Sequence, residues 1–186
     1  QIGDQCWFSE NCRYLPAVSP SIEGNATDPY HYVYGYEGTD VAAAKATDNY
    51  DTYGVLYNWP AVMTEDVCPS SWHIPSSGEF IQLLDYLGEW VEENNEGVGS
   101  GGKMKDDLQW DGSNSSGFSA LPGGVRDYFQ NNFWGYGSYG MWWTSLDFYS
   151  APFSFAYRYS LSNGSNSCWR LDNYQATGLS ARCIQD

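Results

Sequence analysis

Basic residues are scarce in this sequence. Its 186 residues include 8 Lys and Arg against 23 Asp and Glu, which gives a formal net charge of −15 at pH 7. Binding to nucleic acid depends on basic patches that neutralise phosphates and release their counterions. The charge balance therefore argues against nucleic acid as a partner, and also against anionic membrane surfaces.

Long hydrophobic runs are missing as well. No stretch reaches the ~18 consecutive apolar residues that a transmembrane helix needs, so we expect no membrane insertion. The sequence contains no internal repeat and no segment with the composition of a domain linker. We therefore expect a single domain over residues 1–186, long enough to bury a sizeable core.

The usual motifs for metal binding and nucleophilic catalysis are absent. The two histidines, His31 and His73, lie far apart, and no cysteine pair has C-x-x-C spacing, so we expect no metal ligands. No Gly-x-Ser-x-Gly segment presents a nucleophilic serine. His73 directly precedes a helix-capping motif, a position that favours a structural histidine. We expect no enzyme activity and no cofactor.

Neighbouring carboxylates occur at Asp106, Asp107 and Asp111, in a loop-like segment. A glycosidase needs its two carboxylates on opposite sides of a cleft, and adjacency in sequence does not establish that. These side chains are more typical of a solvated face. The acidity of the chain leaves a structural calcium ion open, because carboxylate oxygens are ligands that calcium prefers.

Several features favour export from the cell. The chain begins with Gln1 rather than Met, as a secreted protein does after its signal peptide is removed. Three Asn-x-Ser/Thr acceptors, at Asn25, Asn114 and Asn163, lie in Gly-, Ser- and Asn-rich stretches expected to be surface loops. We predict a secreted or cell-surface glycoprotein.

Five cysteines are present, and they fit disulfides better than a metal site in an exported chain. They are Cys6, Cys12, Cys68, Cys168 and Cys183. Because the count is odd, one thiol is left over, either buried and inert or bonded to another chain.

Alternating side chains predict strands. The clearest case is residues 153–161, where aromatic or aliphatic residues alternate with small or polar ones. The same period predicts strands at 30–36 and 179–183.

Helical signals are fewer. Ser76 and Glu79 have the spacing of a capping box, apolar residues follow at helical spacing, and Gly88 supplies a stop. A shorter helix is expected over 40–46, and loops over 92–102 and 112–117. Together these elements predict an α+β domain with short antiparallel strands, one or two helices and long loops.

The chain resembles the Fibrobacter succinogenes major paralogous domain family through nearly its whole length. The segments that carry the resemblance are Trp7-Phe-Ser-Glu-Asn-Cys-Arg-Tyr14, Tyr53-Gly-Val-Leu-Tyr-Asn-Trp-Pro60, Cys68-Pro-Ser-Ser-Trp-His-Ile-Pro-Ser76, Gly117-Phe-Ser-Ala-Leu-Pro-Gly-Gly-Val-Arg126, Gly140-Met-Trp-Trp-Thr-Ser145 and Leu179-Ser-Ala-Arg-Cys-Ile184. The resemblance implies a C-type-lectin-like fold, related to the formylglycine-generating enzyme group. It also implies an exported or cell-surface module, while the function of family members is largely unassigned.

The resemblance implies a disulfide between Cys68 and Cys183, whose counterparts are usual in the family. We also expect a bridge that involves Cys12, with Cys6 or Cys168 as its partner. A Cys6–Cys12 bridge requires a turn, because a continuous strand would hold the two residues ~20 Å apart. A Cys12–Cys168 bridge would join the opening segment to a late hairpin.

An aromatic, glycine-rich stretch is the best candidate for a binding surface. It contains Trp134, Tyr136, Tyr139, Trp142 and Trp143. Sugars stack on such rings, and protein interfaces favour Tyr and Trp. Trp142 and Trp143 are adjacent, so in a strand at least one of them should point into the core.

Two functions are compatible with these features. The first is a non-catalytic extracellular structural or adhesive subunit that works through protein–protein contacts. Family members usually carry a further strand before the segment matching residues 1–7. A sheet without it would have an open edge for pairing with another copy, giving a filament, unless a loop covers that edge. The alternative is a lectin-like carbohydrate-binding module, although the Glu-Pro-Asn and Gln-Pro-Asp motifs of calcium-dependent lectins are absent.

Overall fold

The computed structural model describes residues 1–64 and 66–186. Its helices are α1 (Val41–Lys45), α2 (Asp48–Tyr53), α3 (Trp59–Thr64), α4 (Ser77–Leu87) and α5 (Gly101–Met104), with a 3₁₀ turn at Glu92–Asn94. Its strands are β1 (His31–Tyr32), β2 (Leu56–Tyr57), β3 (Trp72–His73), β4 (Glu89–Val91), β5 (Glu96–Val98), β6 (Gly123–Asp127), β7 (Asn132–Tyr136), β8 (Tyr139–Ser150), β9 (Phe153–Ser162), β10 (Cys168–Tyr174) and β11 (Ile184–Gln185). No helix in the described part of the chain is long and apolar enough to cross a membrane.

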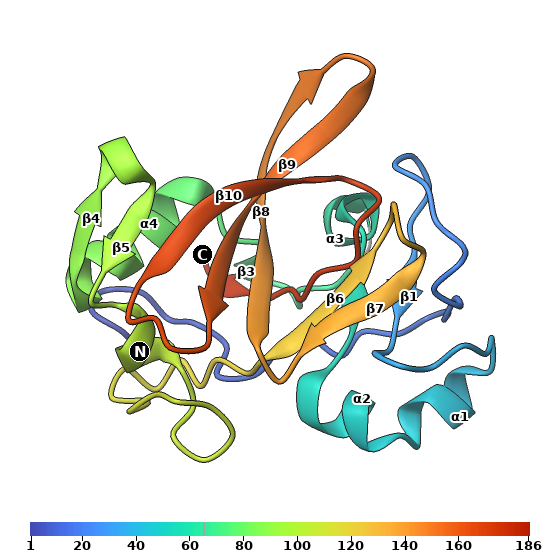
Figure 1. Cartoon of the computed structure of the whole chain (residues 1–186), viewed down its shortest axis with the longest axis horizontal. Coiled ribbons are helices and arrows are strands. Elements are labelled where there is room, and N and C mark those ends of the chain that lie inside the picture. Colours follow the sequence, from blue (N-terminus) through green and yellow to red (C-terminus); the bar gives the residue numbers. More distant parts are fainter. Residues whose placement is uncertain (65) are drawn as a thin grey trace.

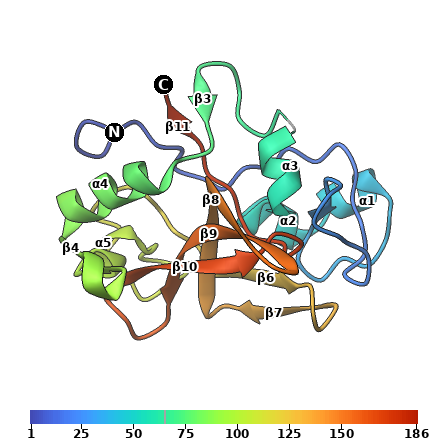
Figure 2. The same cartoon turned by 90° about the horizontal axis from the view of Figure 1, so that it is seen from above.

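The main sheet has five antiparallel strands in the order β4-β5-β10-β9-β8. Three two-stranded ladders, β1–β2, β3–β11 and β6–β7, surround it. Both termini lie on the side of the molecule where β3 and β11 pair (Figure 2). The mixed α+β class is therefore confirmed.

Two strands are longer than expected. β8 has 12 residues and β9 has 10, and they pair from Tyr139↔Ser162 to Ser150↔Phe153 across a register shift between Trp143 and Asp147. The far end of this hairpin projects beyond the rest of the molecule (Figure 1). The alternation over 153–161 predicted β9 correctly, because each of its faces meets a different environment.

The predicted capping box is present at α4. The Ser76 side chain accepts a hydrogen bond from the Glu79 amide at 3.2 Å, and the Glu79 carboxylate accepts one from the Ser76 amide at 2.7 Å. The buried face of the helix consists of Ser77, Phe80, Leu83, Leu84 and Leu87. Burial of each large apolar side chain stabilises the fold by about 1.5–3 kcal/mol, so packing rather than capping holds α4 in place.

Several predicted elements differ in extent. Only His31–Tyr32 of the expected strand over 30–36 pairs, and within 179–183 only Leu179 and Ser180 form isolated bridges, in place of a continuous strand. The expected loop over 92–102 contains a 3₁₀ turn, β5 and the start of α5. The described residues form five α-helices where one or two were expected, because short segments are capped locally, as Asp40 caps α1 and Thr47 caps α2.

Two hydrophobic clusters fill the core, and β8 divides them. Trp143 belongs to the cluster that contains the disulfide region, while Trp142 belongs to the cluster beneath α4. Successive strand residues point to opposite faces, so adjacent tryptophans enter different clusters. Both are fully buried, which fixes the position of β8 within the molecule.

Candidate functional site

The five predicted binding residues divide into two groups. Trp142 and Trp143 are fully buried, and their indole N–H groups donate to Asn11 Oδ1 and to the Tyr57 carbonyl, both at 2.8 Å. These two residues are therefore part of the core, which corrects their assignment to a binding surface. The remaining three, Trp134, Tyr136 and Tyr139, are exposed.

Tyr136 forms a surface with the half-buried Tyr34 and Tyr53, which we call the tyrosine platform, while Trp134 and Tyr139 form a separate ring pair. The Tyr136 ring lies 5.2 Å from both the Tyr34 and the Tyr53 rings, and the Trp134 ring lies 5.4 Å from Tyr139. Partial burial and the contact with Tyr136 raise the pKa of Tyr53 to about 12, so its hydroxyl stays protonated at neutral pH.

A polar cavity of about 390 Å³ lies beside the tyrosine platform. Thr52 lines this cavity, and the next residue, Tyr53, belongs to the platform. The cavity is lined by Ser9, Glu10, Asn11, Arg13, Asp51, Thr52, Asp106, Gln109, Ser119 and Leu121. Within it, Arg13 pairs with Glu10 at 3.0 Å and donates to the Asp51 carbonyl at 2.7 Å.

A second aromatic surface lies at the projecting hairpin and the segments beside it. This hairpin aromatic surface consists of Phe148, Phe153 and Phe155 from the hairpin, Tyr174 from β10, and Tyr128 and Phe129 from the turn between β6 and β7. The Phe153 ring lies 5.2 Å from Tyr174 and 6.2 Å from Phe129, which is 65% exposed. The alternation of Phe153 and Phe155 signalled a strand, but it could not show that this end of the strand extends beyond the core.

The outer edge of β8 is free at the same place. β8 is the last strand of the five-stranded sheet. In the middle of the strand, the Trp143 amide donates to the Ser180 carbonyl, and the Ser145 amide donates to the Pro75 carbonyl. Over 147–150, the described part of the chain provides backbone partners only from β9. This edge is exposed and flanked by Tyr149, which is 71% exposed.

One disulfide is present, between Cys68 and Cys183, as the resemblance implied. The expected bridge from Cys12 to Cys6 or Cys168 is not formed, and all three are free thiols. Cys12 lies beside Cys183 because its amide donates to the Ala181 carbonyl at 2.9 Å. Cys168 is buried in the other hydrophobic cluster, so the hairpin that was expected to reach Cys12 does not do so.

His73 joins the C-terminal residue to the start of α4. Its Nδ1 lies 2.7 Å from an Asp186 carboxylate oxygen, and its Nε2 lies 2.9 Å from Glu79. Partial burial alone would lower the pKa of His73, but the two carboxylates together raise it above its usual value. His73 thus connects the cap of α4 with the residue that follows β11, an arrangement that ties segments together.

The remaining predicted positions lie in loops. Asn25 and Asn114 are half-buried, and Asn163 is exposed. Each of these side chains makes hydrogen bonds, for example from Asn163 Nδ2 to the Gly137 carbonyl at 3.0 Å. In the acidic loop, Asp111 forms an ion pair with the buried Lys105 at 2.6 Å. Among the described residues, the only set of three potential metal-ligating atoms within 4.8 Å is that of Cys12, Cys68 and Cys183.

The chain was compared with family models, curated proteins and solved structures. The family model described as the Fibrobacter succinogenes major domain matches residues 1–185. No curated protein and no solved structure matches the chain.

Proposed function

Since the chain belongs to the Fibrobacter succinogenes major domain family, we propose that it is a non-catalytic extracellular structural or adhesive subunit that self-associates through its projecting hairpin. We further propose that the domain has a C-type-lectin-like fold, as the family resemblance implies, and that it is secreted and glycosylated. The observation that carries the proposal is the free edge of β8 over 147–150.

A free strand edge offers unpaired N–H and C=O groups to another strand. Natural sheets usually protect such an edge with Lys, Pro, a bulge or a covering loop. Here the edge is flanked by Tyr149 on one face and by Phe148 on the other, because neighbouring strand residues point to opposite faces. A strand added at this edge would pair its backbone and bury both aromatic side chains.

The hairpin aromatic surface strengthens the case for a protein partner. Large aromatic side chains carry much of the binding energy at protein interfaces. A second copy is the occupant that this argument favours, because it carries the same edge and the same aromatic side chains. Two β8 edges paired about a two-fold axis would give a closed dimer. Pairing β8 with β4, at the opposite edge of the sheet, would instead repeat as a filament.

The acidic charge opposes this contact only weakly at physiological salt. Asp147 and Asp172 are exposed on strands of the hairpin region. The screening length at physiological ionic strength is ~8 Å, so diffuse repulsion is largely suppressed while packed contacts persist.

A paired-variant experiment tests the proposal. The double variant Phe129→Ser/Tyr149→Ser removes two highly exposed aromatic side chains, one from the neighbouring β6–β7 turn and one from the free edge of β8. The control Tyr86→Ser/Leu108→Ser removes two comparably exposed residues elsewhere. By light scattering and negative-stain microscopy, the wild type and the control should assemble, while the hairpin variant should remain at 20.9 kDa. A monomeric wild type over all concentrations and salts, or a hairpin variant that assembles normally, would contradict the proposal.

Carbohydrate binding is a second candidate, and the tyrosine platform favours it. A sugar ring could stack on Tyr136 while its hydroxyls reach the carboxylate and amide groups of the adjacent polar cavity. A glycan array should then give a signal that Tyr136→Ala abolishes and Tyr86→Ala leaves intact. A blank array, with calcium and with chelator, would eliminate this candidate.

A further inference from the structure

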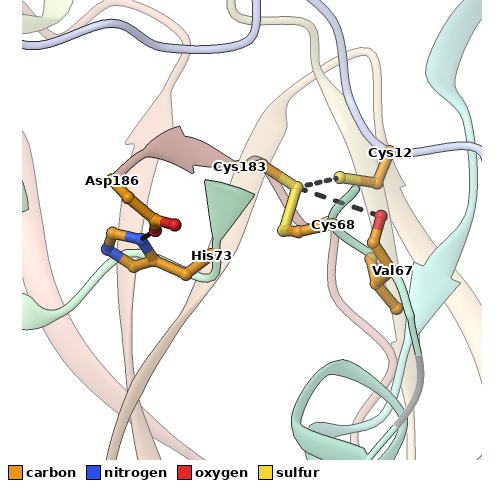
Figure 3. Close-up of a disulfide and its surroundings, with 6 residues drawn as sticks. All are labelled: Cys12, Val67, Cys68, His73, Cys183 and Asp186. Carbon is orange, nitrogen blue, oxygen red and sulfur yellow. Dashed lines mark hydrogen bonds and ion pairs between the residues drawn. A yellow bond between two sulfur atoms is a disulfide. The ribbon is translucent and has the colours of Figure 1, made fainter. Parts of the chain in front are cut away.

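Three of the five cysteines lie together in the core. The Cys68–Cys183 disulfide is accompanied by the free thiol of Cys12, and all three sulfur atoms lie within 4.8 Å of one another (Figure 3). The Cys12 sulfur is 3.4 Å from the Cys183 sulfur, a contact distance for two sulfur atoms. Cys12 takes no part in the Cys68–Cys183 disulfide.

We propose that Cys12 exchanges with the Cys68–Cys183 disulfide, so that Cys183 bonds either to Cys68 or to Cys12. The Cys12 thiol loses its proton and its thiolate attacks the Cys183 sulfur. The Cys12–Cys183 bond forms, the Cys68–Cys183 bond breaks, and Cys68 leaves as a thiolate that takes up a proton. One disulfide and one thiol are present before and after, so the step needs no oxidant or reductant.

The backbone already holds Cys12 and Cys183 in neighbouring segments. The amide of Cys12 donates to the Ala181 carbonyl at 2.9 Å, and the amide of Phe8 donates to the Cys183 carbonyl at 3.0 Å. A bond between the two sulfurs would therefore join segments that are already paired. The loop between the bonded cysteines would lengthen only from a separation of 115 to one of 171 residues. Chain-entropy constraints depend on the logarithm of loop length, so the two pairings constrain the unfolded chain similarly.

The exchange would deliver a thiol toward the surface. Cys12 is buried, whereas Cys68 is only partly buried and lines a surface cavity of about 330 Å³ together with Met63, Asp66 and Trp72. The product would thus carry its free thiol where small reagents can reach it. Cys68 becomes a site for thiol modification, by an electrophile or by a small-molecule disulfide.

The surroundings of Cys12 make the exchange slow. Burial raises the pKa of Cys12 to about 12, although the nearby Arg182 charge acts in the opposite direction. Only a small fraction of the thiol is therefore ionised at neutral pH, and exchange requires the thiolate.

Trapping with N-ethylmaleimide tests the proposal on the oxidised, unreduced chain. This reagent alkylates thiols irreversibly, so it would capture Cys68 each time exchange exposes it. Peptide mapping should show label accumulating on Cys68 with time, while a Cys12–Cys183 bond replaces Cys68–Cys183. Cys12→Ala should abolish labelling of Cys68. The control Cys168→Ala, at a buried free cysteine in the other cluster, should leave it unchanged.

A variant that lacks Cys68 tests the proposal independently. In Cys68→Ser, refolded in the same oxidising buffer as the wild type, mapping should find Cys12 bonded to Cys183. Either of two results would overturn the proposal: wild-type Cys68 still unlabelled after incubation well beyond the minutes to hours of uncatalysed disulfide rearrangement, or Cys12 and Cys183 both recovered as thiols in Cys68→Ser. The wild-type arm requires no variant, so a folding defect in a variant cannot mask the result.

Discussion

At the scale of single residues, buried arginines hold loops together in an acidic chain. Arg182 is fully buried, lies 4.1 Å from the Phe118 ring, and donates to Asn11 Oδ1 at 3.0 Å and to the Phe118 carbonyl. Burial lowers its pKa to about 9, which still leaves the guanidinium charged at neutral pH. Carbonyl oxygens and the face of the Phe118 ring stabilise this buried charge.

Removing this side chain should be costly. We predict that Arg182→Ala lowers the free energy of unfolding by about 3 kcal/mol, because buried acceptors lose their donor and a cavity is left. Urea denaturation of both proteins measures the difference. The exposed Arg13→Ala, whose ion pairs lie at the surface, should cost less than about 1 kcal/mol. Equal losses for the two variants would contradict the structural role of Arg182.

His73 should make stability depend on pH. Its folded pKa is raised above the ordinary value of 6.5 by Asp186 and Glu79. A raised pKa means that the stabilisation is complete below the unfolded pKa and is lost as pH rises through the folded pKa. We predict a loss of less than about 1 kcal/mol across this window, since the pairs are partly solvated. His73→Gln should show a flat profile there by thermal or urea denaturation, and an unchanged slope would contradict the assignment.

At the scale of elements, features set by local sequence signals could be predicted, whereas features set by tertiary contacts could not. α4 was predictable because its cap and its apolar spacing agree, and β9 because its alternation is regular. The burial of both Trp142 and Trp143 was not predictable, since it depends on β8 crossing between two hydrophobic clusters. The proximity of Cys12 to Cys183 was also not predictable, because it arises from pairing between segments 171 residues apart.

The cap of α4 gives a test at this scale. Ser76→Ala removes the acceptor for the Glu79 amide and should lower the free energy of unfolding by about 1 kcal/mol, whereas Ser76→Gly should cost only a few tenths. Ser70→Ala, at an exposed loop position, should change it by less than about 0.5 kcal/mol. Denaturant titrations distinguish these values. A neutral Ser76→Ala would show that packing alone determines where the helix begins.

At the scale of the whole molecule, charge should set the conditions for assembly. A net charge of −15 repels like copies, and the screening length falls from ~30 Å at 0.01 M salt to ~8 Å at physiological ionic strength. We predict that self-association is weaker at low salt and stronger at physiological salt, as measured by sedimentation over a salt series. Association that weakened steadily as salt increased would indicate an interface of opposite charges, which the proposed hairpin contact does not contain.

The central claim is that copies associate through the free edge of β8. Hydrogen–deuterium exchange of the wild-type chain, at dilute and at assembling concentrations, tests it most directly. We predict that amides over 147–150 become protected as the chain assembles, while those of the loop over 112–117 do not change. Assembly without new protection over 147–150 would contradict the account, because it would show that the copies meet elsewhere.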